Sequence, residues 1–222
     1  MVSTTKGTTA QPDQLEQLRS DIHRRMSSCE SGRILEWIEG KTYEDVLQDI
    51  PIYLRIKLIA AGFDEFLPGL NFKYVGSHSW QILLAAKPSL VEHLDTRKVD
   101  QSLLFWLLDN LPTMHDSLCL RNLTEINQVC VARKHPHLIP RLRYTKLTGQ
   151  FLQHFLCLYP RYASECDLST MSPGQWKTLL YHRPKLLKHC KPEYIGDVIK
   201  YFLSEHPEWT EEAERRGFLP AQ

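Results

Sequence analysis

Prolines recur along this chain at a fixed interval. They stand at positions 88, 112, 136, 160 and 184, each 24 residues after the one before, and another follows at position 207. At a background frequency of ~5% proline, four further hits on a set period would arise by chance roughly once in 10⁵ trials. A constant period of this length is typical of repeat proteins, in which each unit packs only against its neighbours. We therefore expect a chain of similar structural units.

Apolar residues keep the same interval ahead of each proline. Eight residues before it stand Trp80, Leu104, Gln128, Leu152, Trp176 and Ile199. Five residues before it stand Leu83, Leu107, Val131, Phe155, Leu179 and Phe202. Four residues before it stand Leu84, Leu108, Ala132, Leu156, Leu180 and Leu203. Positions i, i+3 and i+4 share one face of an α-helix, so each unit is predicted to contain a helix with a buried face. Both tryptophans are accordingly predicted to be core residues rather than platforms for stacking bases.

Each predicted helix also has a start and an end. Twelve residues before the proline, or eleven in the shorter last unit, stand Gly76, Asp100, Thr124, Thr148, Ser172 and Gly196. These residue types are favoured at the N-cap, where the first backbone N–H groups of a helix need partners. The proline ends the helix because its ring disfavours the helical conformation in the residue before it. The spacing thus predicts α-helices of about ten residues.

A second, shorter helical turn is predicted after each proline. Two residues after it the apolar column is Leu90, Met114, Leu138, Tyr162, Leu186 and Trp209, and six residues after it Leu94, Leu118, Leu142, Cys166, Cys190 and Ala213. An earlier, degenerate unit has Asp64 in the place of the proline. Alternating strand patterns and the hairpin dipeptides Asn-Gly and Asp-Gly are absent. The predicted fold class is all-α: a short α-solenoid of about seven helical repeats with an N-terminal helical cap.

The domain organisation is predicted from the limits of the repeat. We expect a disordered tail (1–12), an N-terminal helical cap (13–50), the repeat array (51–217) and a second tail (218–222). Within the cap, helices are predicted over Asp13–Ser28, Ile34–Ile38 and Tyr43–Ile50, the last one capped by Thr42.

Composition favours a cytoplasmic protein. The chain is 42% hydrophobic, which suffices for a core, but it has no run of 18 apolar residues that would span a membrane. The segment Met1–Asp13 lacks the apolar stretch of a secretory signal. The six cysteines include no CxxC pair, so reduced and mostly buried thiols are expected.

No combination of side chains predicts catalysis or a metal centre. Cys166 and Cys190 are candidate nucleophiles, and His189 adjoins Cys190. Both cysteines, however, occupy a column that holds leucine in other repeats. Structural thiols are therefore expected there. His135, His137 and His182 lack the i, i+4 spacing of a helical zinc site. Since phosphate-binding glycine loops are also absent, we expect no enzymatic activity, cofactor, metal or small-molecule substrate.

The net charge of +1 is unevenly distributed. Between residues 131 and 191 there are eleven Lys or Arg but only two acids, Glu165 and Asp167, so this segment carries +9 and the remainder −8. Equivalent positions of stacked repeats line up, so bases near the prolines are predicted to form one surface, which we call the basic ridge. Its residues are Arg133, Lys134, His135, His137, Arg141, Arg143, Arg161, Arg183, Lys185, Lys188 and Lys191. The alternative is a solvated face balanced by the acidic ends of the chain.

Two adjacent units carry a family likeness. They are LTGQFLQHFLCLYPRYASECDLS (Leu147–Ser169) and MSPGQWKTLLYHRPKLLKHC (Met171–Cys190). The pattern W..LL...P.....C, which the second of them matches in full, resembles tandem repeats of large, uncharacterised bacterial proteins, over residues 75–214. The resemblance implies a bacterial or phage origin and a helical repeat, but no activity. The stretch LLYHRPKLL is also similar to the LLxxxPxLL signature of mitochondrial transcription-termination repeats, which bind nucleic acid but have a longer period.

Two functional hypotheses follow from the basic ridge. The first is a non-enzymatic scaffold, adaptor or regulatory subunit that engages the acidic surface of a protein partner. The alternative is a nucleic-acid-binding repeat protein, alone or within a ribonucleoprotein complex, because a cationic ridge also suits a phosphate backbone. A membrane is not an expected partner.

Overall fold

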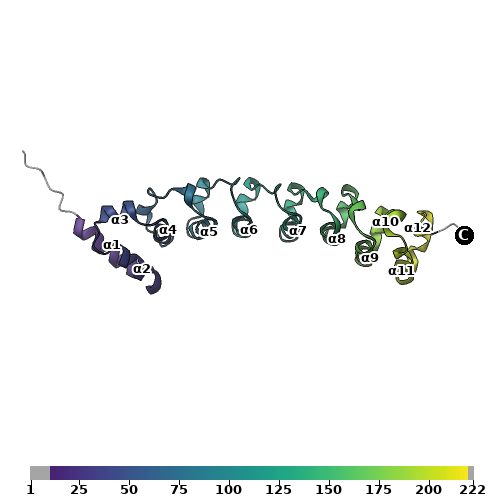
Figure 1. Ribbon diagram of the computed structural model, residues 1–222, viewed down its shortest axis with the longest axis horizontal. Helices are drawn as coiled ribbons and strands as arrows, with labels where there is room; N and C mark the ends of the chain where they lie inside the picture. Colours follow the sequence, from purple (N-terminus) through teal and green to yellow (C-terminus); the bar gives the residue numbers. More distant parts are fainter. Residues whose placement is uncertain (1–10, 220–222) are drawn as a thin grey trace, which may run out of the picture. The chain divides into compact units, whose positions relative to one another are not determined.

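The computed structural model describes residues 11–219, and within that range every regular element is a helix, either α or 3₁₀ (Figure 1). The all-α prediction is therefore confirmed. The chain divides into two compact units: unit 1 ends at Leu118 and unit 2 begins at Cys119. None of the described helices combines the length and the hydropathy that crossing a bilayer requires.

Unit 1 begins with three packed helices and continues with alternating α and 3₁₀ segments. Its elements are α1 (Gln11–Arg25), α2 (Ser28–Ile38), α3 (Tyr43–Asp49), α4 (Ile52–Ala60), η1 (Asp64–Phe66), η2 (Phe72–Tyr74), α5 (Ser77–Ala86), η3 (Pro88–His93), α6 (Gln101–Asn110) and η4 (Pro112–Ser117). Helix α1 packs against α2 and α3, while α5 packs against both α4 and α6.

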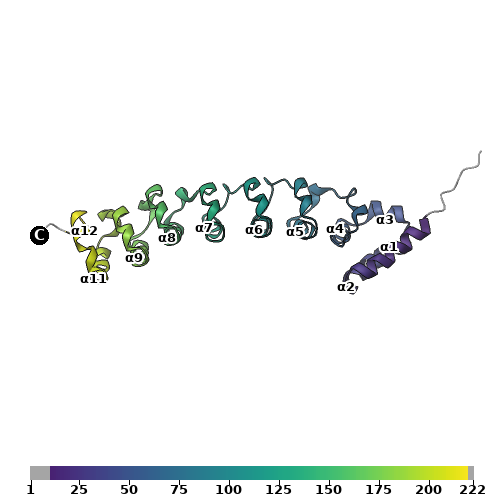
Figure 2. The same ribbon diagram turned by 180° about the vertical axis from the view of Figure 1, so that it is seen from behind.

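Unit 2 repeats the alternation. Its elements are α7 (Glu125–Lys134), η5 (Pro136–Arg141), η6 (Tyr144–Lys146), α8 (Gly149–Leu158), η7 (Pro160–Glu165), η8 (Leu168–Thr170), α9 (Pro173–His182), η9 (Pro184–His189), α10 (Pro192–Ile195), α11 (Val198–Glu205), η10 (Pro207–Trp209) and α12 (Thr210–Arg215). Helices α7, α8 and α9 lie side by side in a row. The 3₁₀ segment of each repeat packs on its long helix, and these segments lie along one edge of the row (Figure 1 and Figure 2).

The periodic proline sets the end of each long helix. The residue before it has φ between −139° and −127° and ψ between 64° and 82° in all six places. This conformation lies outside the helical region, as expected for a residue that precedes proline. Each proline then opens a 3₁₀ segment, where its missing N–H costs no hydrogen bond. One steric rule thus produces the same helix break in successive units.

The helix starts follow the prediction except in the last unit. Asp100 and Ser172 cap α6 and α9 by accepting hydrogen bonds from Leu103 and Gln175. Gly196 is not an N-cap, contrary to the prediction: it ends α10 with φ +52°, and Asp197 precedes α11. The short helix α10 occupies the chain up to Ile195, so Gly196 serves as its end and the cap of α11 lies one residue later.

The predicted columns form the core. Leu83, Leu107, Val131, Phe155 and Leu179, which stand five residues before the prolines, are all completely buried. Both column tryptophans are buried as well. The polar exception, Gln128, is buried too, and its side-chain amide donates to the Leu123 carbonyl at 3.1 Å. The hydrophobic pattern therefore identified the buried face of each helix correctly.

The N-terminal region differs in detail from its prediction. Helix α1 ends at Arg25 rather than Ser28, because Ser27 is extended and begins α2. Thr42 caps α3 as predicted: its side chain accepts from the Asp45 N–H, and the Asp45 carboxylate accepts from the Thr42 N–H at 3.1 Å. Of the predicted tail 1–12, residues 1–10 lie outside the described residues, and Gln11 already belongs to α1.

Three of the long helices are preceded by a short turn that the sequence pattern did not predict. Segments η2, η6 and η8 are single 3₁₀ turns placed shortly before the next long helix. In two of them a side chain ahead of the turn accepts a backbone N–H: Asn71 from Lys73 and Asp167 from Ser169. These local hydrogen bonds fix the path by which the chain enters the next helix.

Candidate partner-binding surface

The residues of the predicted basic ridge all lie in unit 2 and are mostly exposed to solvent. His135 and Arg141 are half-buried, and the other nine residues of the ridge are exposed. They come from the end of α7, from η5 and the residues after it, from η7, and from the end of α9 with η9. The surface is therefore spread over three successive repeats.

Four residues of the ridge meet in one hollow. A groove of about 610 Å³ runs between η7 and η9, which lie side by side. We call it the η7–η9 groove, and its lining residues are Pro160, Arg161, Ser164, His182, Arg183, Pro184, Lys185, Leu186, Lys188 and His189. The ring of Pro160, the ring of Pro184 and the side chain of Leu186 give it an apolar component, while six of its ten residues are basic.

The repeat explains why these cations converge. Arg161 and Lys185 each follow the proline of their unit by one residue, and Ser164 and Lys188 each follow it by four. Because both prolines open 3₁₀ segments of the same length, equivalent side chains lie at equivalent places on η7 and η9. The sequence period therefore brings together groups that are 24 residues apart.

The cations of the groove are not neutralised by nearby acids. Across residues 11–219, no carboxylate comes within ion-pair distance of Arg161, Lys185 or Lys188. The Arg161 guanidinium instead lies over the Tyr162 ring, 4.9 Å from its centroid, and donates to the Tyr162 hydroxyl at 3.2 Å. A fixed positive group without an acidic partner of its own is suited to binding an anionic group from outside.

Arg183 has a second role that the sequence did not reveal. Its Nε donates to the Cys157 carbonyl at 2.8 Å, which ties the end of α9 to the end of α8. Tyr159 occupies the same place in the preceding unit and donates from its hydroxyl to the Ala132 carbonyl at 2.6 Å. In these two repeats the residue before the proline therefore connects to the preceding repeat, and Arg183 supports the structure of the groove as well as lining it.

Two histidines complete the groove. His182 was not part of the predicted ridge, because it stands on the helix two residues before the proline rather than beside it. His189 is half-buried, and its pKa is lowered by burial and then by the neighbouring charges of Lys188 and Arg216. The lowered pKa keeps His189 neutral near pH 7, so His189 adds no positive charge to the groove at that pH.

The remaining bases of the ridge lie outside the groove. Arg133 and Lys134 stand in the last turn of α7, and His135 and His137 flank Pro136 with their ring centroids 6.2 Å apart. Lys191 forms an ion pair of 3.8 Å with Glu193. In unit 1, Lys87 precedes its proline as Arg183 does, but it is paired with Asp64 at 2.5 Å. The η7–η9 groove is thus where the structure concentrates the predicted charge.

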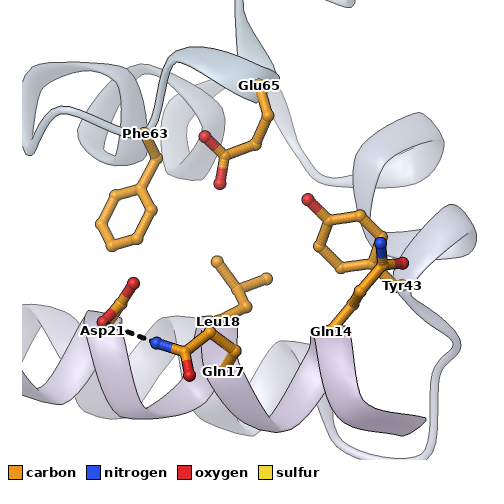
Figure 3. A pocket seen from close by; sticks show the side chains of 7 residues that line it. All are labelled: Gln14, Gln17, Leu18, Asp21, Tyr43, Phe63 and Glu65. Atoms are coloured by element: carbon orange, nitrogen blue, oxygen red, sulfur yellow. Dashed lines mark hydrogen bonds between the residues drawn. The ribbon is translucent and has the colours of Figure 1, made fainter. Parts of the chain in front are cut away.

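Unit 1 contains a hollow of opposite character (Figure 3). It measures about 330 Å³ and is lined by Gln14, Gln17, Leu18, Asp21, Tyr43, Phe63 and Glu65. Asp21 accepts hydrogen bonds from Gln17 at 3.3 Å and from Arg24 at 2.6 Å. Arg25 lies over the Phe63 ring, 4.7 Å from its centroid. Because the aspartate and the aromatic ring already have cationic neighbours, this hollow offers little to an external ligand.

The thiols do not form a nucleophilic centre. Cys190 is completely buried, and burial raises its pKa to about 12. Cys166 is half-buried, and burial raises its pKa to about 11. The expectation that the cysteines are mostly buried is wrong for Cys29, Cys119 and Cys130, which are exposed. Among the described residues, no group of three His, Cys, Asp or Glu side chains is placed to hold a metal ion.

Thiol labelling of the native protein tests the burial of Cys190. A pKa raised from 9.0 to about 12 lowers the thiolate fraction by about 10³ at neutral pH. We expect mass spectrometry to show iodoacetamide modifying exposed Cys119 and Cys130 at least about a hundredfold faster than Cys190. In guanidinium chloride the rates should converge. Native labelling of Cys190 at the rate of Cys130 would contradict its placement in the core.

In comparisons with family models, curated proteins and solved structures, nothing matches this chain. Its function must therefore be inferred from its own residues.

Proposed function

We propose that this chain is a short α-solenoid of about seven repeats that acts as a non-enzymatic binding scaffold or adaptor in the cytoplasm. The η7–η9 groove is its contact surface, and the ligand is an acidic segment of a protein partner. The observation that carries the proposal is the groove itself, in which Arg161, Lys185 and Lys188 face a hollow without acidic neighbours. No metal, cofactor or small-molecule substrate takes part.

The energetics of the groove agree with a specific but modest contact. A fully exposed ion pair stabilises a complex by only about 0–1 kcal/mol. Several cations beside apolar rings stabilise a complex more strongly, because the rings exclude water and a bound acid contacts more than one positive group. The long-range field of these cations also accelerates association with acidic surfaces. Salt should therefore weaken binding without abolishing it at moderate ionic strength.

A second candidate, nucleic-acid binding, is supported by a different part of unit 2. Tyr181 on α9 and Tyr201 on α11 expose 62% and 64% of their surface. Lys177 lies over the Tyr201 ring, 5.1 Å from its centroid. Exposed rings beside cations are typical of surfaces that stack the bases of single strands. The η7–η9 groove has no Phe, Tyr or Trp in its lining, which favours a peptide over a nucleic acid there.

A pull-down from a lysate of the source organism tests the proposal. The bait is the wild-type chain, compared with the groove variant Arg161→Glu, Lys185→Glu, Lys188→Glu, at low and moderate salt and with or without nuclease. Arg183 is left intact because it bonds to the Cys157 carbonyl. We expect the wild type to capture a protein that stays bound through nuclease treatment and moderate salt. The groove variant should capture at least about tenfold less of it.

The matched control changes the net charge equally outside the groove. Lys146, Lys177 and Lys200 are exposed residues of unit 2 that do not line it, so the control is Lys146→Glu, Lys177→Glu, Lys200→Glu. It should retain the protein partner. Equal loss in both variants would indicate a bulk charge effect. Capture of nucleic acid that depends on Lys177 and Lys200, with no nuclease-resistant protein, would replace the scaffold by the second candidate.

A further inference from the structure

We infer that the η7–η9 groove recognises an extended peptide carrying two acidic side chains three residues apart. This inference rests on the proposed function and specifies its ligand. It starts from the repeat: Arg161 and Lys185 are equivalent residues of stacked units and line the same groove. A ligand that contacts both must place two acidic groups at the spacing of one repeat.

The spacing of stacked helical units selects the conformation of the peptide. Packed helices lie roughly 8–10 Å apart, and we take this as the spacing of equivalent backbone positions, such as those of Arg161 and Lys185, on neighbouring repeats. A polyproline II helix rises about 3.1 Å per residue with three residues per turn, so side chains i and i+3 share a side and lie about 9 Å apart. In a β-strand, side chains on one face repeat at about 7 Å or 13 Å, and neither value fits.

The other lining residues are consistent with such a peptide. Pro160 and Pro184 stand beside the two cations and are half-buried, so each presents part of an apolar ring. Small apolar residues or prolines between the two acids would cover these rings. Ser164 and Lys188 occupy the next equivalent pair and would contact the peptide backbone or a further acid. Extended, proline-rich segments also lose little conformational entropy on binding, because they are extended beforehand.

Three peptides of matched length and flanks test the spacing, each with a fluorescent label and the full chain as receptor. Their cores are Glu-Pro-Pro-Glu, Glu-Glu-Pro-Pro and Gln-Pro-Pro-Gln, so the first two have the same composition and charge. Fluorescence anisotropy should give a dissociation constant for the first that is about tenfold lower than for the second. The glutamine peptide should bind weakest of the three.

Single neutral variants locate the contacts. In Lys185→Gln or Arg161→Gln, the first two peptides should bind equally, because only one of the two cations remains. Lys146→Gln, a change outside the groove, should leave the tenfold preference intact. This comparison separates simultaneous contact with both cations from general electrostatic attraction. If only general attraction operated, loss of one cation would weaken the binding of both acidic peptides alike.

The possible failures are distinguishable from one another. If both acidic peptides bind equally to the wild type and the groove variant binds neither, the spacing inference falls and the proposed function stands. Tighter binding of a helical peptide with glutamates seven residues apart, or of an oligonucleotide of equal charge, would also overturn the inference. If no acidic peptide binds at millimolar concentration, the inference falls, and the pull-down decides the proposed function independently.

Discussion

Replacing Leu180 by alanine should destabilise most of unit 2. Leu180 stands four residues before Pro184 and is completely buried on α9, which packs against α8, α10 and α11. Truncating a fully buried leucine typically costs about 2–5 kcal/mol, because it removes apolar contacts and leaves a cavity. That is a large fraction of the ~5–15 kcal/mol that stabilises an ordinary domain. In a short array each repeat is supported by its neighbours, so the loss should spread beyond α9.

Hydrogen exchange followed by mass spectrometry measures this effect segment by segment. We expect protection to fall throughout residues 125–205, with a lower midpoint in a thermal melt. Thr178→Ala on the exposed face of the same helix is the control, and it should change stability by less than about 0.5 kcal/mol. If Leu180→Ala melts like the wild type, the apolar column four residues before the proline does not form the core.

The helix frame could be predicted from the sequence because its causes are local. A proline disfavours the helical conformation in the preceding residue whatever surrounds it, so the ends of α5 to α9 followed from the 24-residue period. The buried faces followed from the helical spacing of apolar residues. The failure at Gly196 has a local cause too: Pro192 opens the additional short helix α10, Gly196 ends it with a positive φ, and α11 therefore starts only at Val198.

The single 3₁₀ turns and the exposure of the cysteines were missed for different reasons. The turns η2, η6 and η8 span three residues each, which is too short for a periodic pattern. Cys130 stands six residues before Pro136, away from the apolar columns, so its exposure was already implied by the repeat. Free thiols are often buried, but the helical face on which Cys130 stands decides its exposure.

The candidate site was predictable in composition but not in geometry. Arg161 and Lys185 share one position of the repeat, so the sequence indicated that they would lie in line. The hydrogen bond from Arg183 to the Cys157 carbonyl could not be predicted, because it depends on how closely α9 approaches α8. His182 reaches the groove from the end of a helix for the same reason. Contacts between neighbouring repeats depend on how far apart the repeats lie, and a sequence period does not give that distance.

Replacing Gly69 by alanine should destabilise unit 1 through a single steric contact. A Cβ at Gly69 would lie 1.4 Å from Nη1 of Arg55 and 2.6 Å from its Cζ. The Arg55 side chain is buried, and its Nη2 donates to the carbonyls of Leu47 at 2.6 Å and Gln48 at 3.0 Å. These carbonyls lie in the last turn of α3, where a cation is favourable. Burial lowers the pKa of Arg55, so the guanidinium depends on these two acceptors.

The expected cost of Gly69→Ala is about 2–4 kcal/mol, because the displaced guanidinium leaves both carbonyls while remaining partly desolvated. Urea denaturation of the single and double variants measures it. If the clash with Arg55 is the cause, adding Gly69→Ala to Arg55→Met should cost less than about 0.5 kcal/mol, since the methionine has no guanidinium to displace. Gly174→Ala meets no atom within 4 Å and should be neutral or slightly stabilising. An equal cost of Gly69→Ala with and without Arg55 would show that the backbone, not the buried arginine, requires glycine there.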